Sequence, residues 1–125
     1  MDTIARWREI AKAHDVAALS GLLADEVVFR SPVVHTPQRG HAITLKYLTA
    51  AFHALNNESF AYIGEWRAER SAVLEFTSVI EGIEIDGVDM ISWGPDGRIV
   101  DFKVMVRPLK AINTLHRLMG ERLAG

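Results

Sequence analysis

The sequence predicts an α+β domain in which a curved antiparallel sheet wraps around helices and leaves a cone-shaped hollow. Through the first half of the chain, and again at its end, apolar residues recur at three- and four-residue steps, which is typical of amphipathic helices. From Ser59 to Arg107 they alternate with polar residues, which is typical of antiparallel strands. Helices segregated from such a sheet define the α+β class.

The first half of the chain predicts two helices, a strand and a longer helix. A helical stripe begins at Ile4, and Asp15 can cap a second, short helix whose apolar face runs to Leu23. The run EVVFRSP is a short strand stopped by Pro32, and SPVVHTPQRG is a loop. A longer helix follows this loop and ends at NNES.

The second half predicts a meander of four strands and a closing helix. The strands are SFAYIGEWRA, SAVLEFTSVI, IEIDGVDMISW and RIVDFKVMV, with hairpin turns at Gly82 and at GPDG. In the third strand, Asp89 falls in step with Ile91 and Trp93 on the apolar side. Pro108 suits the first position of a helix, and apolar residues at helical spacing follow it.

Length and composition restrict the class of protein. A chain of 125 residues corresponds to one domain, over residues 1–125. The net charge is −2 with no run of Lys or Arg, so we expect neither nucleic acid nor a membrane as a partner. There are no cysteines, the N-terminus does not resemble a signal peptide, and no apolar run could span a bilayer. The expected location is the cytoplasm.

Asp89 is the residue that most needs an explanation. An ionised carboxylate among apolar neighbours is costly unless it is paired, hydrogen-bonded or protonated. One interpretation is that Asp89 faces the hollow and serves there as an acid or a hydrogen-bond donor. The alternative is a structural Asp89 that bonds a backbone amide or the Trp7 indole N–H.

Four stretches of the chain together resemble a known superfamily. They are HDVAALSGLLADEVVFRSP, TPQRGHAI, VLEFTSVI and GVDMISWGPDGRIVDFKVMVRPL. In order and spacing they resemble the nuclear transport factor 2-like superfamily, in its SnoaL-like and ketosteroid-isomerase-like branch. The resemblance implies a single SnoaL-like domain with the cone-shaped α+β barrel and an additional C-terminal helix. It does not imply a function, because this fold hosts enzymes, binding proteins and dimerisation modules.

The isomerase branch allows a comparison residue by residue. Its oxyanion-site aspartic acid lies eight residues before the glycine of the final turn, which corresponds to Asp89 and Gly97 here. Its first-helix tyrosine corresponds to Trp7 and its general-base aspartate to Ser31, so we do not expect steroid isomerisation. The epoxide-hydrolase branch needs an aspartate where this chain has Val104.

We expect Asp89 to be the catalytic residue of the hollow, if the protein is an enzyme. The residues expected to line the hollow and bind a ligand are Trp7, Phe29, Ser31, His35, Tyr47, Leu74, Phe76, Ser78, Ile91, Trp93, Phe102 and Val104. His35 is also considered as an acid–base partner of Asp89. No histidine pair has the spacing of a metal motif, so we expect no metal, and we expect no other cofactor.

Two functions from different classes remain open at this stage. The first is binding of a small apolar or weakly polar molecule, with a metal-free isomerase, cyclase or dehydratase reaction by proton transfer at Asp89. The second is a non-catalytic ligand-binding or dimerisation module, which the serine at position 31 favours. The apolar residues Val88, Met90 and Met105 fall on the opposite face of the sheet, and the superfamily resemblance implies a homodimer through that face.

Overall fold

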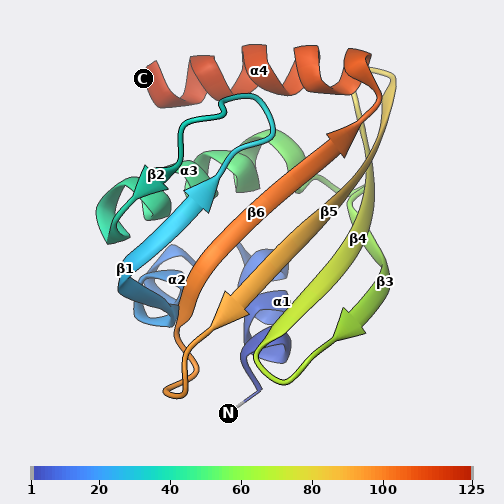
Figure 1. Cartoon of the computed structure of the whole chain (residues 1–125). Helices are drawn as coiled ribbons and strands as arrows, with labels where there is room; N and C mark the ends of the chain where they lie inside the picture. Colours follow the sequence, from blue (N-terminus) through green and yellow to red (C-terminus); the bar gives the residue numbers. More distant parts are fainter. Residues whose placement is uncertain (1, 125) are drawn as a thin grey trace.

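The computed structural model describes residues 2–124, which form four helices and a six-stranded sheet (Figure 1). In chain order the elements are α1 (Thr3–Ala13), α2 (Val16–Leu22), β1 (Leu23–Arg30), β2 (Gln38–Arg39), α3 (His41–Leu55), β3 (Ala61–Arg67), β4 (Ser71–Ile80), β5 (Ile83–Trp93), β6 (Ile99–Arg107) and α4 (Leu109–Ala124). The predicted α+β class is confirmed. Within residues 2–124, no helix has the length and apolar character needed to cross a membrane.

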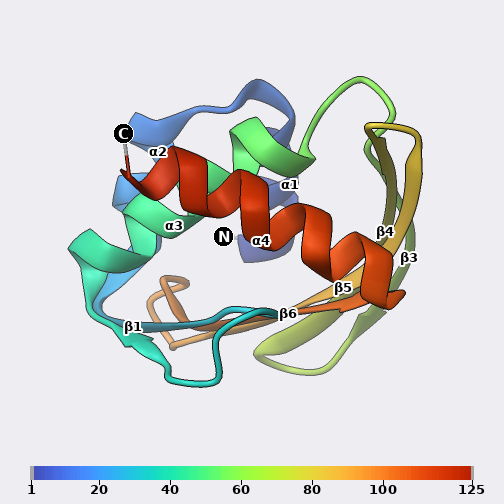
Figure 2. The same ribbon diagram turned by 90° about the horizontal axis from the view of Figure 1, so that it is seen from above.

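The sheet is curved, open and mixed. Its strand order is β2-β1-β6-β5-β4-β3. Strands β3 to β6 form the predicted antiparallel meander, whereas β1 joins the last strand of the meander, β6, in parallel. Helices α1, α2 and α3 lie on one side of the sheet, and α4 crosses the end of the molecule above them (Figure 2). The buried side chains lie between the sheet and the helices.

The early elements differ from the prediction in two places. Asp15 caps α2 as predicted, since its side chain accepts a hydrogen bond from the N–H of Ala18 at 3.1 Å. Leu23, however, belongs to β1 and not to the face of α2, because it is buried and pairs with Ile99 of β6. The predicted loop after β1 contains the two-residue strand β2, which pairs with β1.

Two clusters of buried side chains fill the space between sheet and helices. The larger cluster comprises Ile4, Trp7, Ile10, Ala11, Leu19, Leu22, Leu23, Val27, Phe29, Leu48, Phe52, Ala72, Leu74, Ile91, Ile99 and Phe102. The smaller cluster lies against α4 and comprises Leu55, Phe76, Ile80, Ile85, Ala111 and Leu115. Tyr62 and Val104 pack against both clusters and therefore lie where the two meet.

The strand register places Asp89 on the inner face of the sheet, as predicted. Asp89 lies between Leu74 of β4 and Val104 of β6 and is only 5% exposed. Two residues earlier, Gly87 lies opposite Phe76, whose ring occupies the space a Cβ atom would need. The carboxyl group is thus held by two neighbouring strands in an apolar setting.

Candidate functional site

A cavity lies where the two buried clusters meet. Its volume is about 50 Å³, and the space between atoms reaches about 610 Å³ only when the solvent at its open mouth is counted. The lining residues are Trp7, Phe29, Ser31, Pro32, Val33, Leu48, Ala51, Phe52, Leu55, Asn56, Phe60, Tyr62, Asp89, Phe102, Val104, Leu115 and Met119. An apolar wall with a few polar groups is typical of a site for a small molecule.

Asp89 has a hydrogen-bond partner in the cavity wall. The hydroxyl of Tyr62 donates a hydrogen bond to the Asp89 carboxylate Oδ2. Tyr62 comes from β3 and Asp89 from β5, so the two side chains meet across β4. Asp89 and Tyr62 are also the only titratable residues among those that line the cavity. Any acid–base chemistry by the cavity wall therefore falls to this pair.

Trp7 orients the Tyr62 hydroxyl. The Trp7 Nε1–H donates to Tyr62 Oη at 2.9 Å. An indole N–H can only donate, so Tyr62 accepts from Trp7 and keeps its own proton for Asp89. The sequence-based alternative, a direct bond from Trp7 to Asp89, is therefore incorrect: Tyr62 stands between them. Three elements, α1, β3 and β5, contribute to this one chain of hydrogen bonds.

Burial adjusts the proton affinity of both groups. Desolvation raises the pKa of Asp89 from 3.8 to about 7, and the hydrogen bond from Tyr62 opposes this rise. Desolvation, followed by the Asp89 charge, raises the pKa of Tyr62 well above its ordinary value. Tyr62 thus stays protonated, while Asp89 exchanges a proton near neutral pH. This is the range that suits a general acid or base.

Arg8 lies behind this pair. Its guanidinium stands over the Tyr62 ring, 5.1 Å from the ring centroid, and forms an ion pair with Glu65 at 3.0 Å. A cation over an aromatic face is attractive, and here it stabilises the position of the Tyr62 ring. Arg8 itself does not line the cavity.

The cavity brings together part of the predicted site. Its wall includes Asp89 and the predicted ligand-binding residues Trp7, Phe29, Ser31, Phe102 and Val104. Leu74, Phe76 and Ile91 also face inward, but they pack within the buried clusters and do not line the cavity. The reason is that alternation predicts the face of a strand and not the height along it at which a cavity opens.

The remaining predicted residues lie elsewhere. Ser78 is buried and donates to the Leu55 carbonyl at 2.9 Å. Tyr47 packs its ring against Phe29, at 5.5 Å between centroids, on the side of the larger cluster. Trp93 lies beside the GPDG turn, where its backbone N–H donates to the backbone carbonyl of Arg70.

His35 is not placed as an acid–base partner of Asp89. It is exposed in the loop between β1 and β2 and does not line the cavity. In residues 2–124, no three His, Asp or Glu side chains come together as metal ligands.

Sequence reasoning missed Tyr62, the partner of Asp89. The run SFAYIGEWRA was expected to form a strand, and in a strand Tyr62 shares a face with Phe60, another cavity residue. A tyrosine on the inner face of a strand needs a partner for its hydroxyl, which was an available signal. Leu115 and Met119 were expected on the stripe of the closing helix, but only the path of α4 brings them to the cavity.

Comparison with known proteins agrees with the fold and the cavity. The family model of the SnoaL-like domain matches residues 4–102. The chain therefore belongs to the SnoaL-like domain family, within the superfamily that its sequence resembles. None of the curated proteins matches the chain.

Solved structures extend the comparison to nearly the whole chain. A steroid delta-isomerase from Pseudomonas aeruginosa is 40% identical, with a TM-score of 0.92, over 98% of this chain and 89% of that one. A protein with a cystatin-like fold from Silicibacter pomeroyi is 29% identical, with a TM-score of 0.89, over 96% and 84% of the two chains. The epoxide hydrolase/cyclase-like enzyme SalBIII is 16% identical, with a TM-score of 0.68, over 84% and 88%, which shows a shared fold.

Proposed function

We propose that this protein binds a small, mainly apolar molecule that carries a carbonyl or hydroxyl oxygen, and that Asp89 transfers a proton to or from it. The observation that carries the proposal is the pairing of Tyr62 with a buried Asp89 in the wall of an apolar cavity. A structural carboxyl needs a partner but no cavity, whereas this one has both.

The reaction best suited to one carboxyl group is an isomerisation. The Asp89 carboxylate takes a proton from the carbon next to a carbonyl group and returns it to a more distant carbon, so atoms and charge balance. Once Asp89 has taken the proton it is no longer a carboxylate, and the Tyr62 hydroxyl beside it becomes free to donate to the oxygen on which negative charge develops. Because the pKa of Asp89 is about 7, the group accepts and releases the proton at neutral pH.

The choice of isomerisation has support from a relative. The solved structure that is 40% identical is described as a steroid delta-isomerase. The departures at Trp7 and Ser31 from the isomerase pattern argue for a different division of roles, with Tyr62 in place of the first-helix tyrosine. Ser31 lines the cavity but carries no carboxylate, so Asp89 is the base in this proposal.

The test is turnover of β,γ-unsaturated ketones, including a Δ5-3-ketosteroid, followed by the absorbance of the conjugated product. We expect Asp89→Asn to lower the rate by about 10²-fold or more while the protein stays folded, because a general base is lost. Equal rates for the variant and the unchanged protein would refute the role of Asp89.

A second candidate, a non-catalytic ligand-binding module, is favoured by the serine at position 31. It predicts that the ketones bind but are not converted. Binding is read from a change in tryptophan fluorescence, because Trp7 lines the cavity and Trp66 and Trp93 do not. Binding without turnover by the unchanged protein would select this second candidate.

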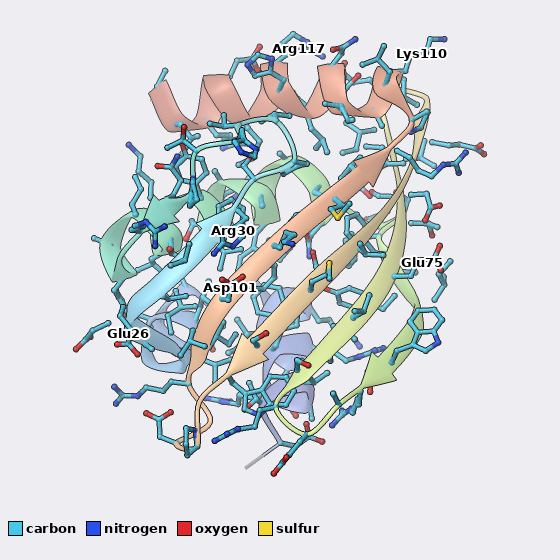
Figure 3. The ribbon with its side chains drawn as sticks, in the orientation of Figure 1. Glu26, Arg30, Glu75, Asp101, Lys110 and Arg117 are labelled. Carbon is cyan, nitrogen blue, oxygen red and sulfur yellow. The ribbon has the colours of Figure 1, made fainter. Side chains whose placement is uncertain are left out.

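We further infer that the protein forms a two-fold homodimer through the outer face of the sheet. Met105 is 54% exposed there and lies opposite Val88, with Met90 nearby on the same face. At the side of this apolar area, Arg30 and Asp101 pair at 3.1 Å across β1 and β6 (Figure 3). An apolar centre beside charged groups is typical of an interface between subunits.

A further inference from the structure

Asn56 is a polar residue of the cavity wall that corresponds to none of the three isomerase positions compared above. It follows α3 directly and is half-buried. It lines the cavity and also a surface groove between α1 and the start of β3. The cavity and the groove share three residues, Asn56, Phe60 and Tyr62. Asn56 therefore stands where the cavity adjoins the groove.

The backbone of Asn56 is held in place from two sides. Its N–H donates to the carbonyl of Phe52 at 3.3 Å, and its carbonyl accepts from His14 Nε2 at 3.0 Å. The His14 ring in turn stacks on the Phe52 ring, at 5.4 Å between centroids. The part of the backbone from which the Asn56 side chain projects is thus fixed.

The side-chain amide of Asn56, in contrast, makes no hydrogen bond with any of residues 2–124. The neighbouring Asn57 shows the opposite behaviour: its Nδ2 donates to the Val79 carbonyl at 2.9 Å, and its Oδ1 accepts from the Ser59 N–H at 2.8 Å. Asn57 thus has a structural role, and Asn56 has donors and an acceptor to spare beside an apolar cavity.

We propose that Asn56 determines specificity by hydrogen bonding to a second oxygen of the ligand. This inference rests on the proposed function, in which the first oxygen lies at Tyr62 and Asp89. The ligand class is then a neutral, mainly apolar molecule with oxygen functions at two separate positions. It is neutral because the cavity wall contains no Lys, Arg or His to balance an anion, and Asp89 would repel one.

The test compares 2-naphthol with 2,6- and 2,7-dihydroxynaphthalene, titrated into the protein and followed by calorimetry. For the unchanged protein we expect at least one diol to bind about tenfold more tightly than 2-naphthol, the value of one well-placed hydrogen bond. In Asn56→Leu, which keeps the size of the side chain, this preference disappears while 2-naphthol still binds. Asn56→Ser, with a shorter polar group, serves as the second variant and retains part of the preference.

The outcomes separate the two proposals. If 2-naphthol binds, Asp89→Asn weakens it, and Asn56→Leu leaves the preference for the diol unchanged, the role of Asn56 is refuted and the cavity site stands. If the unchanged protein prefers neither diol, the role of Asn56 is also refuted. If none of the three compounds binds, both the cavity site and the role of Asn56 fail.

Discussion

Tyr62 and Asp89 meet diagonally across a strand that separates them. Tyr62 lies opposite Phe76 of β4, and Asp89 lies opposite Leu74, two residues away on the same strand and the same face. The hydroxyl thereby reaches the carboxyl group inside the cavity. This arrangement needs no loop, because both groups lie on strands of the sheet.

Asp89→Asn is expected to change how stability depends on pH. The folded protein binds the Asp89 proton more tightly than the unfolded chain, because the pKa rises from 3.8 to about 7. The contribution of Asp89 to stability is therefore fully present below about pH 4 and is lost as the pH rises from about 4 to about 7, by at most about 4 kcal/mol. Asparagine does not titrate, so the variant should lose this fall. Urea unfolding at several pH values measures it.

The control for this prediction is Asp25→Asn, which changes an exposed aspartate of β1. This variant should keep the fall in stability between pH 4 and 7. A plot of its free energy of unfolding against pH should have about the same slope as that of the unchanged protein. A slope that stays the same in Asp89→Asn would contradict the buried, protonated state of Asp89.

Tyr62→Phe should raise the pKa of Asp89 further. The Tyr62 hydrogen bond stabilises the ionised carboxylate, and its removal leaves desolvation unopposed. The carboxyl ¹³C resonance of Asp89, followed in a pH titration, should move its midpoint to higher pH. If the protein converts a ketone, the part of its pH–rate profile that reports ionisation of Asp89 should also move to higher pH.

Tyr47→Phe is the matched control, because Tyr47 is the other tyrosine of the chain and lies outside the cavity wall. Its titration curve for Asp89 should coincide with that of the unchanged protein. A midpoint that moves to lower pH in Tyr62→Phe would show that the hydroxyl does not donate to the carboxylate.

Ser31→Asp should add a second carboxyl group to the cavity. Ser31 lines the cavity, and its Oγ accepts from the Val33 N–H at 3.1 Å, a bond that an aspartate can also accept. With a base at this position, isomerisation of a β,γ-unsaturated ketone should accelerate by about 10²-fold, the usual contribution of a general base. Stopped-flow absorbance measures the rate, and Ser31→Asn provides a polar side chain without a charge. No gain in a folded Ser31→Asp protein would count against a substrate bound next to Ser31.

Met105→Asp should dissociate the proposed homodimer. A carboxylate at the centre of an apolar interface must be desolvated, and its burial raises the dimer dissociation constant by about tenfold or more. Light scattering coupled to gel filtration measures the mass. Asn113→Asp, on the exposed side of α4, should leave the mass unchanged. A monomeric mass for the unchanged protein at micromolar concentration would exclude the dimer.

Gly87→Ala should destabilise the fold. A Cβ at Gly87 would lie 2.5 Å from Phe76 Cζ and 2.8 Å from the Met105 carbonyl oxygen, so the ring and the strand must shift. Overpacking of this kind costs about 1–3 kcal/mol, measurable by thermal or urea unfolding. Gly120→Ala, in α4, meets nothing within 4 Å and should be neutral or stabilising. Equal stability of the two variants would contradict the close approach of Phe76.

The inner and outer faces of β4, β5 and β6 could be predicted from the sequence because their alternation is regular. Leu74, Asp89 and Phe102 all face inward as expected. Such a pattern carries no information about depth, so it could not separate the residues of the cavity wall from those packed solidly beside it. The position of α4 over the cavity depends on contacts between distant parts of the chain, which local periodicity does not contain.

Strand β3 shows why Tyr62 was harder to find than Asp89. Its register shifts between Tyr62 and Gly64, so Tyr62 pairs with Phe76 and Gly64 pairs with Glu75. After this bulge the alternation changes face, and Trp66 lies 59% exposed opposite Val73. A strict period of two would place Tyr62 and Trp66 on one face, which obscures the inward role of Tyr62.

The division of the interior into two clusters has a mechanical consequence. The side chains of each cluster pack against one another, and the cavity lies where the two clusters meet. An occupant of this cavity would touch both clusters and join them into one continuous interior. Ligand binding and rigidity are thus coupled in this molecule, because the ligand fills the space that the side chains leave open. Slower amide hydrogen exchange in α4 on binding would show this coupling.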